Sequence, residues 1–221
     1  MSTLHLSYNC LGFELHDNDR FIALYRATEE LPRTDAPKPC FAPIYTPSGK
    51  LITEYRPADH TWHTGLYYGW VHVNDANLWG GGWYIPESGR YEDVENSHGV
   101  QRHDAFSDTV TDGQDVSLTE ALTWLDAADQ PMVSETRQFR FQTLENTSGY
   151  LWMIDSTITP VVDKVTLGAS RAAKYSGLWI RTGPPFSDAH HRSSEGLEGH
   201  EQIMGAHARW VSAAGSAGGM V

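Results

Sequence analysis

The residues best suited to chemistry lie in one short segment that follows a proline. His60 and His63 are separated by two residues, with Arg56 and Asp59 just before them. Histidine can give or take a proton near neutral pH, because its ordinary pKa lies close to it. A turn there would bring both rings to one side, where Arg56 and Asp59 would orient them and also bind substrate. We expect His60 and His63 to serve as acid, base or hydrogen-bonding group. The alternative is that one ring caps backbone groups while the other is exposed.

Aromatic side chains accompany these histidines. Trp70, Trp79 and Trp83 follow within the next stretch, and two of them flank Gly80, Gly81 and Gly82. An indole offers a flat apolar face that a sugar ring can cover. The glycines indicate a close backbone approach or a mobile rim. We expect Trp79 to contact the substrate, although tryptophans in such positions more often belong to the core.

A later segment mixes cations with aromatics. Lys174 precedes Trp179 and Arg181, and the last two share strand parity. Such a mixture suits sugar hydroxyls or a sugar carboxylate, and it is equally typical of a surface strand with extended basic side chains. We expect Lys174, Trp179 and Arg181 to bind substrate.

Composition limits the partners. Sixteen basic and 28 acidic residues give a formal charge of −12, which opposes binding to nucleic acid and to anionic lipid. A neutral or cationic small ligand fits better. The longest apolar runs are far shorter than the ~20 residues that span a bilayer, and residues 1–9 show no secretion signal. We expect a soluble, cytoplasmic protein with no nucleic-acid or membrane partner. Cys10 and Cys40 are expected to be buried thiols.

Alternating apolar and polar residues dominate the chain. Segments 133–142 and 149–162 alternate strictly, and turn residues at 145–149 join them, which predicts an antiparallel hairpin. Shorter extended segments are expected at 4–8, 20–25, 41–45, 65–73, 116–124, 177–181 and 207–211. No window shows a helical apolar stripe, so helix should be scarce. The pattern predicts an all-β fold, a large antiparallel sandwich, as one domain over residues 1–221.

Three further segments are irregular. Residues 31–39 contain three prolines and should form an extended connection. Residues 184–201 are polar, and loops of that length are often lids or binding loops. At the C-terminus we expect a strand over 206–211, a turn over 212–219 and a returning strand that begins at 220. We therefore expect the sandwich to lack its last strands.

Three sequence blocks resemble a known family. They are PCFAPIYTPSG at 39–49, RPADHTWHTGL at 56–66 and AHARWV at 206–211. With the steps LWG at 78–80 and VTLG at 165–168, their spacing from about residue 38 to 215 is similar to that of a soluble bacterial family labelled methane oxygenase PmoA or DUF6807, a domain of unknown function.

The resemblance implies a β-sandwich like the galactose-mutarotase supersandwich and a place near sugar-catabolic oxidoreductases. Members continue past the end of this chain with a block containing Asp-His-Pro and Arg-His-Pro, which the resemblance implies is missing here.

Glu135 is the candidate base in such a fold. It shares a strand face with Arg137 among apolar residues. In a mutarotase-like enzyme, a carboxylate base faces a histidine acid beside the sugar ring. The alternative is a structural ion pair between Glu135 and Arg137, because buried charges need partners.

A metal site would use the same two histidines. Zinc needs three or four converging ligands, and His60 and His63 supply two. The others would come from Asp59, His72, His98 or His103, if the fold brought them together. We expect no metal and no other cofactor.

Our leading hypothesis is therefore a carbohydrate-active or carbohydrate-binding protein whose ligand lies in a sandwich cleft. If it is an enzyme, we expect histidine acid–base chemistry without a redox cofactor, as in a sugar epimerase, mutarotase, lyase or hydrolase. The alternatives are a non-catalytic sugar-binding module associated with a sugar oxidoreductase, and a metal-dependent oxygenase as the family label suggests.

Overall fold

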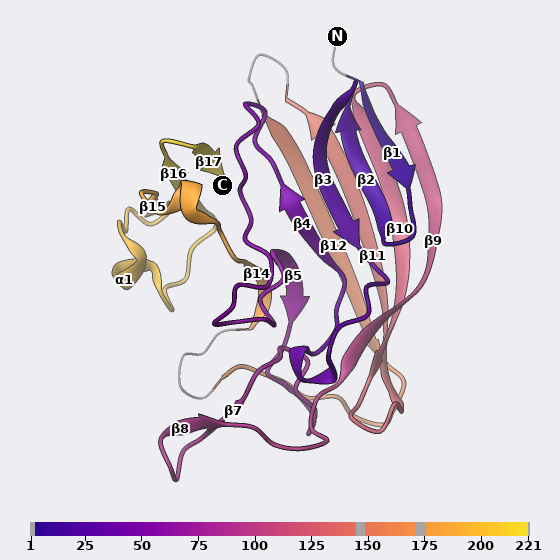
Figure 1. Ribbon diagram of the computed structural model, residues 1–221, viewed down its shortest axis with the longest axis vertical. Helices are drawn as coiled ribbons and strands as arrows, with labels where there is room; N and C mark the ends of the chain where they lie inside the picture. The colour runs from indigo at the N-terminus through magenta and orange to yellow at the C-terminus, as the bar shows by residue number, and fades with distance from the viewer. Residues whose placement is uncertain (1–2, 145–148, 171–175, 221) are drawn as a thin grey trace.

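Two antiparallel sheets pack face to face and form the body of the structure (Figure 1). The structure is a computed structural model that describes residues 3–144, 149–170 and 176–220. The first sheet has six strands in the order β1-β2-β3-β4-β5-β14. They are β1 (Leu4–Tyr8), β2 (Gly12–Asp17), β3 (Arg20–Arg26), β4 (Cys40–Ile44), β5 (Leu66–Gly69) and β14 (Gly177–Ile180). The all-β sandwich predicted from the sequence is confirmed.

The second sheet contains the longest strands. Its order is β12-β11-β10-β9, formed by β9 (Val100–Asp112), β10 (Asp115–Leu125), β11 (Pro131–Thr143) and β12 (Tyr150–Pro160). The pairing of β11 with β12, from Val133 opposite Pro160 to Thr143 opposite Tyr150, confirms the predicted hairpin. Most of its predicted turn, at 145–148, lies outside the described residues.

The core lies between the two sheets. Aromatic residues of the first sheet, such as Phe13 and Phe41, meet Phe139 and Phe141 of β11 with ring centroids 5.5–6.3 Å apart. Because side chains of a strand alternate between its faces, every second residue of β11 enters this core. Each large apolar side chain buried there contributes about 1.5–3 kcal/mol to stability.

Shorter elements surround the sandwich. They are η1 (Arg33–Asp35), β6 (His72–Val73), β7 (Trp83–Ile85), β8 (Arg90–Glu92), β13 (Leu167–Gly168), η2 (Pro184–Phe186), β15 (His190–Ser193), α1 (His200–Ile203), β16 (Val211–Gly215) and β17 (Gly218–Met220). In Figure 1 the small sheet β15-β16-β17 and α1 lie to one side of the sandwich, beyond β14. Within the described ranges, no helix is long and apolar enough to cross a membrane.

Several sequence-based predictions need correction. The predicted loop at 184–201 contains η2, β15 and part of α1. The predicted strand at 207–211 begins only at Val211, and the predicted turn at 212–219 is itself the β16–β17 hairpin. The connection at 31–39 contains η1. Cys10 is exposed rather than buried, because it lies in the connection between β1 and β2, whereas Cys40 is buried as expected.

Candidate functional site

A cavity of about 320 Å³ opens on the outer face of the first sheet, where loops cover β4 and β5. Phe41 of β4 points into the sandwich core, so its neighbour Cys40 points to the opposite face, where it packs with Tyr67 and Trp79. The cavity is lined by His60, Trp62, His63, Trp79, Gly80, Gly82, Tyr91 and Trp179. The two predicted histidines and two of the predicted binding tryptophans therefore come together.

The loop formed by residues 56–63, called the histidine loop, is held by hydrogen bonds to Asp35 of η1. Arg56 has a positive φ of 50° and donates from its guanidinium to the Asp35 carboxylate at 2.6 Å. The hydroxyl of Thr61 donates to the other oxygen of that carboxylate at 2.8 Å. The backbone N–H of His63 donates to the carbonyl of His60 at 2.9 Å. The resulting turn stacks the His60 and His63 rings, with centroids 4.8 Å apart and planes 21° from parallel.

His60 forms a pair with Asp59. Its Nδ1 lies 2.8 Å from Oδ2 of Asp59, and because an ionised carboxylate only accepts hydrogen bonds, Nδ1 is the donor. This bond holds the pKa of Asp59 below its usual value. With the proton fixed on Nδ1, the other ring nitrogen of His60 is the one available for proton transfer.

His63 is more deeply placed than His60. Its side chain is buried, and within the described part of the chain its Nδ1 has no hydrogen-bond partner. Burial, with the nearby His60 as a smaller cause, lowers the pKa of His63 to about 4. The ring is therefore neutral at pH 7. Buried polar atoms without a partner are few in native proteins, and each calls for an explanation such as a functional role.

Residues 79–82, called the glycine loop, form a second wall of the cavity. The Asn77 side chain accepts hydrogen bonds from the backbone N–H groups of Trp79 at 2.8 Å and Gly80 at 2.9 Å. Gly80 and Gly81 have φ values of 104° and 67°, and a Cβ on either would lie 2.4–2.6 Å from Trp62 atoms. Of the two sequence-based interpretations of this glycine run, the close backbone approach is therefore the one that the structure shows.

The other predicted binding residues lie around this cavity rather than in its wall. Arg56 supports the histidine loop and Asp59 bonds to His60, as described above, and neither is part of the lining. Arg181 donates to Glu54 at 3.1 Å and is absent from the lining, whereas its neighbour Trp179 of β14 lines the cavity. Lys174 lies outside the described residues.

Two aromatic lining residues were not among the predicted contacts. Trp62 lies between the two histidines in sequence, so its position in their turn could have indicated it. Tyr91 comes from β8, and no local sequence signal connects that exposed hairpin with the histidines.

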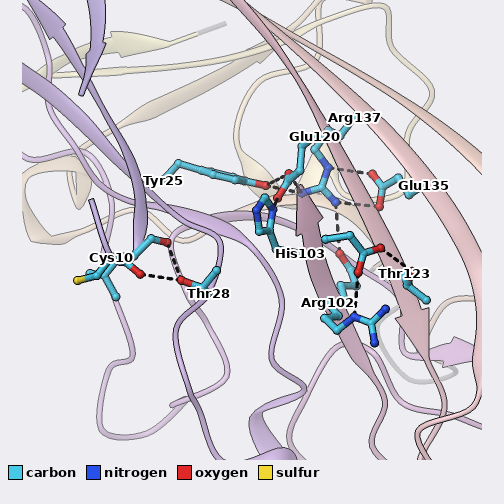
Figure 2. Close-up of polar contacts among 12 residues, drawn as sticks. Cys10, Tyr25, Thr28, Arg102, His103, Glu120, Thr123, Glu135 and Arg137 are labelled. Carbon is cyan, nitrogen blue, oxygen red and sulfur yellow. Dashed lines mark hydrogen bonds and ion pairs between the residues drawn. The ribbon is translucent and has the colours of Figure 1, made fainter. Parts of the chain in front are cut away.

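Glu135 is buried inside the sandwich and does not line the cavity. Figure 2 shows its carboxylate facing Arg137. Glu135 accepts hydrogen bonds from Arg137 at 2.8 and 3.0 Å, from Trp124 at 2.7 Å and from Ser156 at 2.6 Å. The structural ion pair with Arg137, the alternative given by the sequence, is what the structure shows.

The same network contains a different histidine–carboxylate pair (Figure 2). Arg137 donates to the Tyr25 hydroxyl at 2.9 Å, Tyr25 donates to Glu120, and Nδ1 of His103 donates to Glu120 at 2.8 Å. Burial raises the pKa of Tyr25 well above its usual value, so Tyr25 stays a phenol. His103 lines a second cavity, of about 250 Å³. From the sequence, His103 was a candidate only as a metal ligand, because Glu120 is 17 residues away in the chain.

The histidines considered as further metal ligands do not converge. His98 donates to the Gly81 carbonyl at 2.8 Å, His72 packs against Trp83, and His103 bonds to Glu120. Among the residues that the structure describes, no three His, Cys, Asp or Glu side chains are grouped as a metal ion would require.

Comparisons with known proteins identify a family and no activity. The model of a family described as "Family of unknown function (DUF6807)" matches residues 13–220. Searches of the curated proteins and of the solved structures each returned no significant match.

Proposed function

Because the chain belongs to the DUF6807 family, whose function is unknown, we propose a function from the cavity itself: it binds a neutral carbohydrate, and His60 transfers protons to or from that ligand. The observation that carries the proposal is the lining, in which indole and phenol rings surround two stacked imidazoles. Aromatic faces cover the apolar side of a sugar ring, and imidazole nitrogens bond to its hydroxyl groups.

Charge supports a neutral ligand. Of the described residues that line the cavity, none is a lysine, arginine, aspartate or glutamate, so a charged sugar group would lose its hydration without an ionic partner among them. The chain's net charge of −12 further disfavours acidic sugars and sugar phosphates. The volume of about 320 Å³ lies near the lower end of the range for ligand sites, which suits a small saccharide.

The Asp59–His60 pair supports proton transfer. A carboxylate that accepts the hydrogen bond from Nδ1 of His60 orients the imidazole ring, and a positioned general acid or base contributes roughly 10²–10⁴-fold to rate. His63 is neutral at pH 7 because its pKa is lowered to about 4, which suits it to hydrogen bonding rather than to acid catalysis. This chemistry needs no redox cofactor.

A sugar-binding module without turnover is the second candidate function. One observation favours it: within the part of the chain that the structure describes, no carboxylate side chain lines the cavity to act as a partner acid or base on the far side of the ligand. Association with a sugar oxidoreductase would be compatible with this role.

A binding screen tests both candidates. Neutral monosaccharides and disaccharides are titrated into the whole chain and followed by calorimetry, with uronic acids and sugar phosphates for comparison. Trp179→Ala should weaken binding of the best neutral sugar about 10-fold, since losing one aromatic contact costs about 1.4 kcal/mol. The matched control is Trp210→Ala, because Trp210 is exposed and absent from the lining.

The outcomes separate the hypotheses. If no neutral sugar binds, or if Trp210→Ala weakens binding as much as Trp179→Ala, the carbohydrate proposal is wrong. If sugars bind and are converted, His60→Gln should abolish conversion while binding persists. Sugar binding without conversion by the wild-type chain would favour the binding module.

A further inference from the structure

Lys38 is buried in the wall between the two loops that form the cavity. Its Nζ lies within hydrogen-bond distance of four backbone carbonyl oxygens: those of Trp79 at 2.8 Å, Asp35 at 3.2 Å, Ala36 at 3.2 Å and Trp62 at 3.3 Å. It also lies 4.7 Å from the centroid of the Tyr67 ring. The ammonium is therefore surrounded by the groups that stabilise a cation without carrying a full negative charge.

This cation has an unusual set of partners. A buried ammonium is normally paired with a carboxylate. Here the Asp35 carboxylate, whose charge acts on Lys38, accepts its hydrogen bonds from Arg56 and Thr61 instead. Among the described residues, no carboxylate forms an ion pair with Lys38. Burial lowers the pKa of Lys38 to about 7, while its carbonyl partners favour the charged form.

The carbonyls come from three separate segments. Asp35 and Ala36 lie at η1, Trp62 lies in the histidine loop and Trp79 begins the glycine loop. Trp62 and Trp79 both line the cavity. The Lys38 ammonium thus connects the histidine loop with the glycine loop. It also connects both loops to η1, whose Asp35 carboxylate accepts a hydrogen bond from Arg56.

We propose that Lys38 is the positioning residue of the cavity: its ammonium ties the histidine loop to the glycine loop and sets the separation of Trp62 and Trp79. The use of this spacing for ligand binding rests on the proposed function, whereas the tie between the loops does not. A methionine of similar length has no donor and would leave the carbonyls without a partner. An arginine would present a planar fork that does not match carbonyls converging on one point.

Hydrogen exchange of the whole chain tests the tie without any ligand. The reporters are the amide of His63, which donates to the His60 carbonyl, and the amide of Gly81, which donates to the Thr34 carbonyl. In Lys38→Met, both should exchange at least about 10-fold faster, because local opening no longer breaks the ammonium contacts. Paired amides of β10 and β11 should keep their rates. The matched control is Lys50→Met, since Lys50 is exposed.

Equal exchange at His63 and Gly81 in Lys38→Met and Lys50→Met would overturn the proposal. So would a uniform increase across β10 and β11, because that indicates a general loss of stability rather than a local tie.

Wild-type protein gives a second measurement should Lys38→Met not fold. At pH 6, ¹⁵N NMR should show one lysine NH₃⁺ resonance that exchanges slowly with water and is shifted upfield by the Tyr67 ring. If every lysine NH₃⁺ group exchanges at the rate of an exposed one, the tie does not exist.

The two proposals fail separately. If no sugar binds but Lys38→Met loosens both loops, the tie stands and the carbohydrate proposal fails. If a sugar binds with unchanged affinity to Lys38→Met, and exchange at both loops is also unchanged, the carbohydrate proposal stands and Lys38 is not a positioning residue.

Discussion

At the scale of single residues, His60 and His63 have different environments although they stack on each other. His60 has a carboxylate partner at 2.8 Å, whereas the Nδ1 of His63 has no partner in the described ranges. The spacing of the two histidines in the sequence predicted that they would share a site. The spacing could not predict which ring is paired with a carboxylate, because the pairing depends on the shape of the turn. Asp35 helps to hold that turn, and it lies 25 positions before His60 in the chain.

The neutral His63 should make stability depend on pH. Its pKa is about 4 in the folded chain against 6.5 ordinarily, so the unfolded chain binds the proton more readily. The free energy of unfolding that the neutral ring contributes is fully present above pH 6.5. It is lost as pH falls towards 4, by up to about 3 kcal/mol. Urea unfolding at pH 7 and pH 4.5 should therefore show a smaller pH-dependent loss for His63→Gln than for wild type.

The control for this prediction is His200→Gln, because His200 is exposed. That variant should lose as much stability as wild type over the same pH interval. An unchanged pH dependence in His63→Gln would contradict the assignment of a neutral, buried ring.

At the scale of elements, β11 and β12 were predictable and β9 was not. Residues of β11 alternate between core and surface, which is the signal that sequence patterns carry. β9 is an edge strand whose residues from Asp108 onward are all exposed, so no alternation marks it. The candidate site was predictable to the same extent. The histidine loop is a local sequence motif, whereas Tyr91 and Lys38 are brought to the cavity only by tertiary contacts.

The polar bridge between the two sheets should be important for stability. Tyr25 of β3 accepts a hydrogen bond from Arg137 of β11 and donates one to Glu120 of β10. Tyr25→Phe removes the bridging oxygen and leaves buried charged groups with unmet hydrogen bonds, which should cost about 1–3 kcal/mol of unfolding free energy. Denaturant unfolding measures this loss.

Tyr8→Phe is the matched control for Tyr25→Phe. The Tyr8 hydroxyl bonds to Thr109 at 2.7 Å at an exposed position, so its removal should change stability by less than about 0.5 kcal/mol. Equal losses in the two variants would show that the buried bridge contributes no more than a surface bond.

At the scale of the whole molecule, two polar centres occupy different places. The network of Glu120, Glu135 and Arg137 lies between the sheets, whereas the cavity of His60 and His63 lies on the outer face of the first sheet. The layer of β4 and β5 separates them, with Phe41 facing one and Cys40 facing the other. Perturbations that are distant and share no partners are generally additive. Substitutions in the network should therefore lower stability without changing ligand binding.

Glu135→Gln tests this separation. The change removes one partner of a buried ion pair, so the unfolding free energy should fall by about 3 kcal/mol. Below the unfolding temperature, affinity for the neutral sugar and hydrogen exchange in the histidine loop should stay at wild-type values, because no atom of Glu135 lines the cavity. Calorimetric titration and denaturant unfolding of one preparation measure both effects. A folded Glu135→Gln variant with weakened sugar binding would mean that the sandwich interior takes part in ligand recognition, as the sequence first suggested for this carboxylate.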